Sequence, residues 1–221
     1  MKARPIRCLI SAGPTREFFD PVRYVSNPSS GKMGYALAAA AVEQGWDVHL
    51  VSGPVMLAPP PGARVEWVIT GSEMFAAVDR AFDDCDILIM TAALIDFRPK
   101  EIAPKKVKKE ALHMVIEMEP VVDVLGTVAR RKKHQLVVGF AAETDNVEAY
   151  AERKLRSKNA DYIVANRIGA AVGGFESDEN SILLLGRDGT RESRGPVAKT
   201  KLGVWLVERF AAELDQRSVS A

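Results

Sequence analysis

The chain has 221 residues, 47% of them hydrophobic and 27% charged, and its 30 basic and 29 acidic residues leave a net charge of +1. This length supports one globular domain with a sizeable core, and the near-neutral charge gives no reason to expect nucleic-acid or membrane binding. Cys8 and Cys85 lack the short spacing of a zinc site or a disulfide framework. With no secretion signal and no apolar run near the ~20 residues of a membrane span, we expect a cytoplasmic protein.

The first part of the chain alternates short apolar runs with helical patterns. The patterns predict strands at 6–13, 46–53, 65–70 and 86–94, and helices at 35–45 and 72–84, the second with Ser72 as N-cap. Such alternation is typical of a parallel sheet whose functional site lies at the carboxyl ends of the strands. The expected fold is therefore α/β: a three-layer, Rossmann-like, mostly parallel sheet.

Residues 96–120 break this alternation. The segment is highly charged, has prolines at 99 and 104, and alternates in polarity only over 111–118, which reads as an exposed strand. A solvated loop is one interpretation. However, a region this long inside a compact domain is more often functional. We expect a single domain over 1–221 with an inserted, extended charged arm at about 97–119.

The remaining chain returns to regular elements. They are helices at 121–132, 146–160 and 199–217, strands at 135–144 and 161–166, and a hairpin at 181–193. Asp188–Gly189 predicts a type I′ or related turn in that hairpin.

Small residues precede the first predicted helix. Ser29, Ser30 and Gly31 lie where the free amides and the dipole of a helix start favour an anion. The segment is not a P-loop, because position 26 is Ser and Met33 replaces the magnesium-binding hydroxyl. A second glycine turn at residue 13 supports a phosphate site, although plain helix capping by Ser and Gly explains the same residues equally well.

Two further patterns admit alternatives. Tyr150 and Lys154 have the spacing of the catalytic pair of short-chain oxidoreductases, but the glycine fingerprint and the acidic ribose ligand of that class are missing. Lys154 and Lys158 share one helix face, where they repel unless an anion lies between them; solvated surface lysines are the simpler interpretation. Lys106 and Lys108 point to one side of an extended arm. These residues indicate an α/β enzyme of phosphorylated nucleotides, with a non-catalytic nucleotide-binding protein as the alternative.

The order of the motifs carries more information. AGPTRE, DPVRYVSNPSSGKMG, TAALIDFRPKEIAPKKVKK, VGFAAET, KLRSKNADYIVAN and FESDEN follow one another from about residue 6 to about residue 210. This order resembles phosphopantothenoylcysteine synthetase, commonly the carboxy-terminal half of bifunctional CoaBC proteins. The resemblance implies a ligase that joins 4′-phosphopantothenate to cysteine through an acyl-cytidylate, with CTP and Mg²⁺. It also implies a homodimer whose arm crosses to its neighbour and, because the flavin half is absent, a possible separate decarboxylase partner.

The resemblance also implies residue roles. Asn27 would donate to the acyl phosphate and orient it, Lys106 would offset charge as pyrophosphate leaves, and Arg23 would bind phosphopantothenate. Nucleotide contacts are expected, partly on physical grounds, at Gly13, Ser29, Ser30, Gly31, Ala92, Asp96, Lys106, Phe140, Lys154 and Lys158. The lysine-rich arm resembles the bacterial form, which uses CTP rather than ATP. The chain departs from the family at 119–122, where Glu-Pro-Val-Val stands in place of an Asn-Pro-Asp-Ile type segment.

Overall fold

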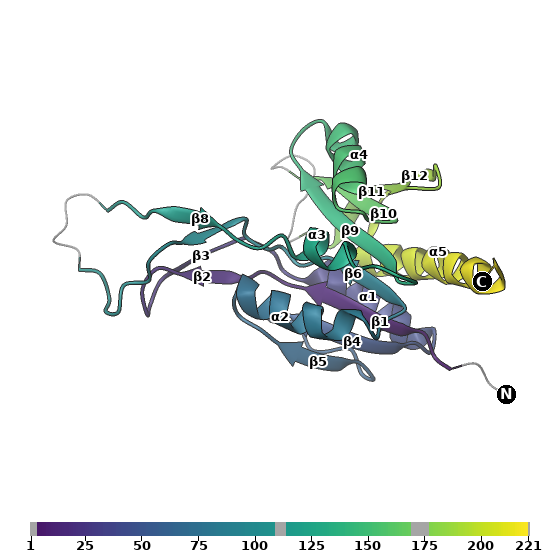
Figure 1. The fold of residues 1–221 in the computed structure, drawn as a ribbon. Helices are drawn as coiled ribbons and strands as arrows, with labels where there is room; N and C mark the ends of the chain where they lie inside the picture. The colour runs from purple at the N-terminus through teal and green to yellow at the C-terminus, as the bar shows by residue number, and fades with distance from the viewer. Residues whose placement is uncertain (1–3, 109–113, 169–176, 221) are drawn as a thin grey trace.

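The computed structural model describes residues 4–108, 114–168 and 177–220, and its centre is a twisted sheet (Figure 1). In the described residues this sheet has eight strands, in the order β12-β11-β10-β9-β6-β1-β4-β5. They are β1 (Arg7–Ala12), β4 (Asp47–Ser52), β5 (Arg64–Trp67), β6 (Ile87–Met90), β9 (Leu136–Glu143), β10 (Tyr162–Arg167), β11 (Glu179–Gly186) and β12 (Arg191–Ala198).

The strand order identifies the architecture. From β5 to β10 all neighbours are parallel, and β11 and β12 add an antiparallel hairpin beyond β10. The parallel part has the doubly wound order, in which the winding reverses between the first and the fourth strand, here β1 and β6. The expected Rossmann-like, mostly parallel fold is therefore confirmed, and it predicts a crevice beside β1 and β6.

Helices cover both faces of the sheet and make three layers. On one face, α1 (Lys32–Glu43) and α5 (Lys199–Ser220) share a core with inward side chains such as Ile10. On the other face, α2 (Gly71–Phe82), α3 (Val124–Ala129) and α4 (Val147–Ser157) pack over side chains such as Leu9. Consecutive strand residues face opposite layers, which is why the central strands read as continuous apolar runs.

The start of α2 differs from the expectation. Its N-cap is Thr70, not Ser72, because the Thr70 hydroxyl accepts from the Glu73 amide while the Glu73 carboxylate accepts from the Thr70 amide. This reciprocal capping box satisfies two amides at once. The buried Glu17 carboxylate accepts from the Gly71 amide at 2.7 Å. A negative charge at this end also complements the helix dipole.

Two short ribbons extend away from the sheet (Figure 1). One pairs β2 (Arg16–Phe18) with β3 (Tyr24–Ser26), and the other pairs β7 (Phe97–Pro99) with β8 (Met118–Pro120). The predicted exposed strand at 111–118 is wrong for 114–117, which lie outside any strand, while 109–113, including Lys109, are outside the described residues. The arm is thus a narrow ribbon at its base.

The β11–β12 turn also differs from a type I′ turn. Gly189 has φ 92° and donates to the Gly186 carbonyl at 3.1 Å, whereas Asp188 keeps a negative φ. Type I′ requires positive φ at both central residues. The geometry matches instead the longer loop in which a type I turn is followed by a left-handed glycine.

Candidate functional site

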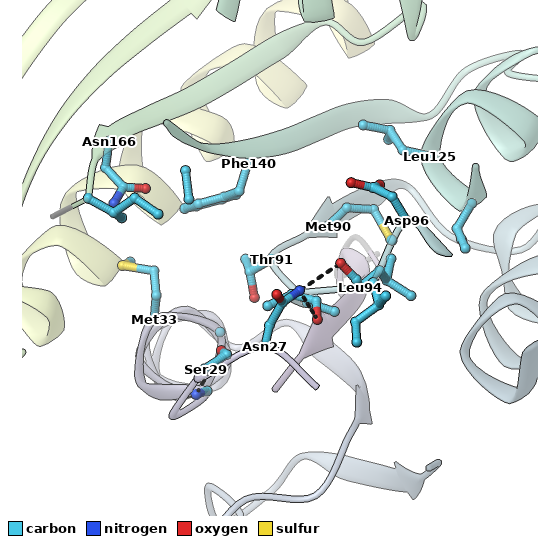
Figure 2. Close-up of a pocket in the computed structure, with 18 of the residues that line it drawn as sticks. Asn27, Ser29, Met33, Met90, Thr91, Leu94, Asp96, Leu125, Phe140 and Asn166 are labelled. Atoms are coloured by element: carbon cyan, nitrogen blue, oxygen red, sulfur yellow. Dashed lines mark hydrogen bonds between the residues drawn. The ribbon is translucent and has the colours of Figure 1, made fainter. Parts of the chain in front are cut away.

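A cavity of ≈ 460 Å³ lies at the carboxyl ends of β6, β9 and β10, beside the start of α1 (Figure 2). Three stretches of chain supply most of its wall: residues around Asn27–Gly34, the Met90–Asp96 segment that follows β6, and Val121–Leu125 before and within α3. Phe140 and Asn166 contribute from β9 and β10. The cavity occupies the crevice that the reversed winding creates.

Asn27 is fixed against the segment after β6. Its Nδ2 donates to the carbonyls of Ala93 at 3.2 Å and Leu94 at 2.9 Å, as the dashed lines in Figure 2 show. Both protons of the amide nitrogen are therefore engaged in this arrangement. The donation to an acyl phosphate that the resemblance implies would require Asn27 to release one of these carbonyls.

The start of α1 has the geometry of an anion site. Its N-cap is Gly31, with φ 76°, and the Gly31 amide donates to the Ser29 hydroxyl at 3.4 Å. The first amides of a helix lack intrahelical partners, and here they lie at the cavity wall because Lys32, Met33 and Gly34 all line it. Plain capping by Ser and Gly therefore still accounts for these residues as well as an anion site does.

The paired lysines of α4 both reach the cavity. Lys158 Nζ lies 2.6 Å from Asp123 Oδ2, and Lys154 Nζ donates to the Phe140 carbonyl at 3.3 Å. Burial lowers the pKa of Lys154 from its usual value; the charge of Lys158 acts in the same direction, and that of Glu143 opposes it. The expected repulsion between the two lysines is thus relieved by protein partners, and an intervening anion is not required for that purpose.

Sequence reasoning missed a cationic group at the other end of the cavity. Lys32 Nζ lies 2.6 Å from Asp178 Oδ1, and the buried Lys199, first residue of α5, lines the same cavity. Burial and the Lys32 charge lower the pKa of Lys199. A signal existed: a lysine in the first turn of a helix with no acidic residue there opposes the helix dipole, which is unusual unless an anion lies nearby.

Some expected site residues lie elsewhere. Neither Gly13 nor Ser30 lines the cavity among the described residues. Gly13, with φ 75°, permits close packing, since a Cβ there would lie 2.9 Å from Val55. Arg23 is held at the base of the arm, and Lys106 is exposed on the arm itself. The described chain brings neither Arg23 nor Lys106 into the cavity that holds Asn27.

The other expected contacts do line the cavity. They are Asn27, Ser29, Gly31, Ala92, Asp96, Phe140, Lys154 and Lys158. Of the departures from the family pattern, Val121 and Val122 also line it, so the apolar replacement lies directly at the site. The FESDEN motif falls partly outside the described residues, which resume at 177.

Comparison with known families places the chain. The family model described as DNA/pantothenate metabolism flavoprotein C-terminal domain matches residues 4–214. The chain belongs to this family. The resemblance drawn from the ordered motifs is therefore confirmed, because the match runs through nearly the whole sequence.

Individual members of the DNA/pantothenate metabolism flavoprotein C-terminal domain family agree. The coenzyme A biosynthesis bifunctional protein CoaBC of Bacillus subtilis (strain 168) is 44% identical over 205 residues, covering 92% of this chain and 50% of that protein. CoaBC of Escherichia coli (strain K12) is 44% identical over 218 residues, covering 96% and 53%. A crystal structure of the C-terminal domain of CoaBC is 40% identical with a TM-score of 0.82, covering 96% of each chain. This chain spans about half the length of the bifunctional relatives it matches.

The described residues contain neither a membrane-spanning helix nor a metal-binding cluster of side chains. Among the helices of the described residues, none has the length and apolar character needed to cross a membrane. In the same part of the chain, no three His, Cys, Asp or Glu side chains gather as a metal site would require.

Proposed function

We propose that this chain is the phosphopantothenate–cysteine ligase of coenzyme A biosynthesis, acting through an acyl-cytidylate. The observation that carries the proposal is the placement of Asn27 beside a helix start with a glycine N-cap, in one cavity at the switch point of the sheet. Membership of the DNA/pantothenate metabolism flavoprotein C-terminal domain family supports it. The similarity to the C-terminal domain of CoaBC supports the same reading over the full chain.

The cavity suits a nucleotide. The α1 amides and Lys32 offer donors to phosphate oxygens, Phe140 offers an aromatic surface for a base, and Lys154 and Lys158 add positive charge along the wall. Asp96, exposed at the rim, can accept from a ribose or base. A cytosine preference is part of the proposal and rests on the bacterial pattern of the arm lysines.

The proposed reaction has two displacements. A carboxylate oxygen of phosphopantothenate bonds to the α-phosphorus of CTP, and the bond from that phosphorus to the bridging oxygen breaks as pyrophosphate leaves. The cysteine nitrogen then bonds to the acyl carbon, CMP leaves, and the amine loses a proton. Lys106 would offset the charge that grows on pyrophosphate, and Asn27 would hold the mixed anhydride in place.

Magnesium fits this proposal as a companion of the nucleotide phosphates. The described residues offer single carboxylates in the cavity, such as Asp96 and Asp123, rather than a three-residue cluster. Mg²⁺ commonly takes one or two carboxylates and completes its sphere with phosphates and water. When bound it would neutralise phosphate charge, while the protein residues orient the reacting groups.

A homodimer, a cytoplasmic location and a separate decarboxylase chain complete the proposal. The base of the arm exposes apolar side chains, among them Val22, Tyr24 and Phe97, which a second copy would cover. A partner's arm would then carry Lys106 toward the cavity, which a single chain does not do. The decarboxylase belongs to the proposal because the relatives are bifunctional proteins.

The deciding experiment is an assay with phosphopantothenate, cysteine, CTP and Mg²⁺, following pyrophosphate and amide product together. Both should form in equal amounts and only when all substrates are present. Absence of pyrophosphate alongside NADPH oxidation would favour the oxidoreductase suggested by Tyr150 and Lys154. Tight CTP binding without turnover would favour a nucleotide-binding module.

A further inference from the structure

The carboxylate of Asp20, at the base of the arm, accepts hydrogen bonds at both of its oxygens. Asp20 is fully buried, with a side-chain exposure of 0%, although it lies in a turn between β2 and β3. Its Oδ1 accepts from the amides of Val22 and Arg23, both at 2.8 Å. Buried charges persist only where hydrogen bonds and a counter-charge compensate them. The question is what these bonds hold.

The second oxygen of Asp20 joins two segments that are far apart in sequence. Oδ2 accepts from Nε and Nη2 of Arg23 at 3.0 and 2.5 Å, and from the Val107 amide at 3.1 Å. Arg23 Nη2 also donates to the Val107 carbonyl at 2.9 Å. The backbone of Val107 therefore gives its proton to one member of the ion pair and accepts a proton from the other.

A second bond fastens the same stretch of arm. The Ala103 amide donates to the Phe19 carbonyl at 3.0 Å, so the arm is tied to the β2–β3 turn on both sides of Lys105 and Lys106. The hydrogen bond from the Arg23 side chain, followed by those from the backbone amides of Val22, Val107 and Arg23, holds the pKa of Asp20 well below its usual range. The carboxylate is thus charged at every pH at which the protein would work.

From this geometry we infer that Asp20 is a positioning residue that locks Arg23 and the Lys106–Lys108 stretch of the same chain into one rigid unit. The inference rests on the proposed function, in which Arg23 binds phosphopantothenate and Lys106 serves the first displacement. The inference adds that Asp20 fixes the positions of Arg23 and Lys106 relative to each other. Acting as a pair, they meet the anionic ends of phosphopantothenate and nucleotide in a fixed relation.

The same bonds define what Arg23 has left to offer a ligand. Nε and Nη2 serve Asp20 and Val107, and within the described residues no acceptor contacts Nη1. The guanidinium carbon lies over the Phe19 ring, 5.2 Å from its centroid. Arg23 therefore presents one nitrogen to substrate rather than a two-nitrogen fork, and lysine cannot replace it because an ammonium cannot span three partners.

Asp20→Asn tests the inference in the full chain. The amide keeps the size of the side chain but loses the charge and presents an N–H toward Arg23 or Val107. We expect hydrogen exchange in the peptide containing Val107 to accelerate by at least about tenfold, because an amide loses a charge-assisted partner. The KM for phosphopantothenate should rise at least about tenfold because Arg23 is misplaced, and kcat should fall because Lys106 is misplaced. The KM for CTP should stay within about twofold, because the cavity wall is intact.

The matched control is Glu117→Gln, which neutralises an ion pair with Lys100 (2.9 Å) in the same arm. This pair is exposed and does not touch Val107, so exchange and both KM values should stay at the wild-type level. If Asp20→Asn behaves like this control, the inference is overturned. If Asp20→Asn does not fold, Val107→Pro removes the same amide proton without altering Asp20. Wild-type kinetics in that variant also overturn it.

A double variant separates positioning from general structural damage. In a Lys106→Gln background and at saturating phosphopantothenate, Asp20→Asn should slow pyrophosphate release by less than about twofold, because the lysine it positions is already gone. Multiplication of the two single effects would mean independent action and would contradict the inference. If the wild-type chain makes no amide product, the proposed function fails. The exchange rate at Val107 then still decides whether Asp20 holds the arm.

Discussion

At the scale of single residues, the site depends on side chains held by backbone atoms. Asn27 bonds the two carbonyls that follow β6, and Lys154 bonds the carbonyl of Phe140. Such contacts fix the position of a side chain without using another side chain. They are invisible in a sequence, because any residue supplies a carbonyl. Substitutions at these positions test both geometry and chemistry.

Asn27→Asp should separate the two displacements. A carboxylate would face the carbonyls of Ala93 and Leu94 and repel them, so the side chain would lose the position that the amide holds. We expect the acyl-cytidylate to form but to pass to product about a hundredfold more slowly, as small misplacements cost about that much. Rapid-quench measurement of the intermediate checks this, with Asn146→Asp on the exposed start of α4 as control. Unchanged overall turnover would refute the role.

Lys106→Gln should stop the reaction earlier. Removing a cation that offsets charge on leaving pyrophosphate is expected to slow the first half-reaction by at least about a hundredfold. Pyrophosphate release in the absence of cysteine is the measurement. Lys105→Gln, its exposed neighbour, should release pyrophosphate at the normal rate. Normal release from the Lys106 variant would contradict the assignment.

The two cysteines should resist modification in the folded chain. Cys8 and Cys85 are 1% and 4% exposed, and burial raises the pKa of both thiols, that of Cys85 to about 12. Alkylation by iodoacetamide near neutral pH should therefore occur only at the rate of unfolding. Because the folded state keeps protons that the unfolded state releases, stability should fall as pH rises above the usual thiol pKa. Alkylation rates with and without denaturant, and unfolding free energies across alkaline pH, check both outcomes.

At the scale of elements, α1 shows why a helix start is hard to place from sequence. The helix begins at Lys32 rather than at the predicted residue 35. The prediction was too late because Gly34, a poor helix former, lies inside the first turn. A Cβ at Gly34 would lie 2.4 Å from Thr91 Oγ1 and 2.6 Å from Ala12 Cβ. The glycine is there for close approach to strands β1 and β6, which weakens local helix propensity in exchange for tertiary packing. The cavity depends on that approach.

The capping box of α2 offers a direct stability test. Thr70→Ala removes the hydroxyl that accepts from the Glu73 amide and should lower the free energy of unfolding by about 1 kcal/mol. Ser72→Ala, two residues further along the chain and outside the cap, should have less effect. Urea unfolding of the two variants measures the difference. An equal loss of unfolding free energy in both variants would contradict a specific contribution of the Thr70 cap.

Periodicity predicted the sheet, its parallel character and most helices, because buried strands and amphipathic faces carry strong local signals. It failed where long-range contacts decide. Helix α3 covers only Val124–Ala129, since Asp123 caps it by accepting from the Gly126 amide. The contact of Lys32 with Asp178 joins residues 146 positions apart. Most of the cavity wall followed from ordered motifs, whereas Lys199 and the Asp20 bonds required the folded chain.

At the scale of the whole molecule, the cavity and the arm are separate. The residues at the carboxyl ends of the strands come together within one chain, but Lys106 lies in the segment between β7 and β8, outside the cavity wall. The ribbon to which this segment belongs extends away from the sheet (Figure 1). A second copy is therefore the natural source of the missing cation if the ligase proposal holds. In a two-fold dimer each arm would complete the cavity of the other copy.

Mixing inactive variants tests this exchange. Asn27→Asp chains supply a normal arm, and Lys106→Gln chains supply a normal cavity wall. If the arm acts across the dimer, random assortment should restore about a quarter of wild-type turnover, since half the dimers are mixed and each has one complete site. Mixing Asn27→Asp with the Asn27→Asp/Lys106→Gln double variant cannot build a complete site and serves as control. If Lys106 acts within its own chain, the first mixture stays as inactive as this control, because no chain then carries both residues.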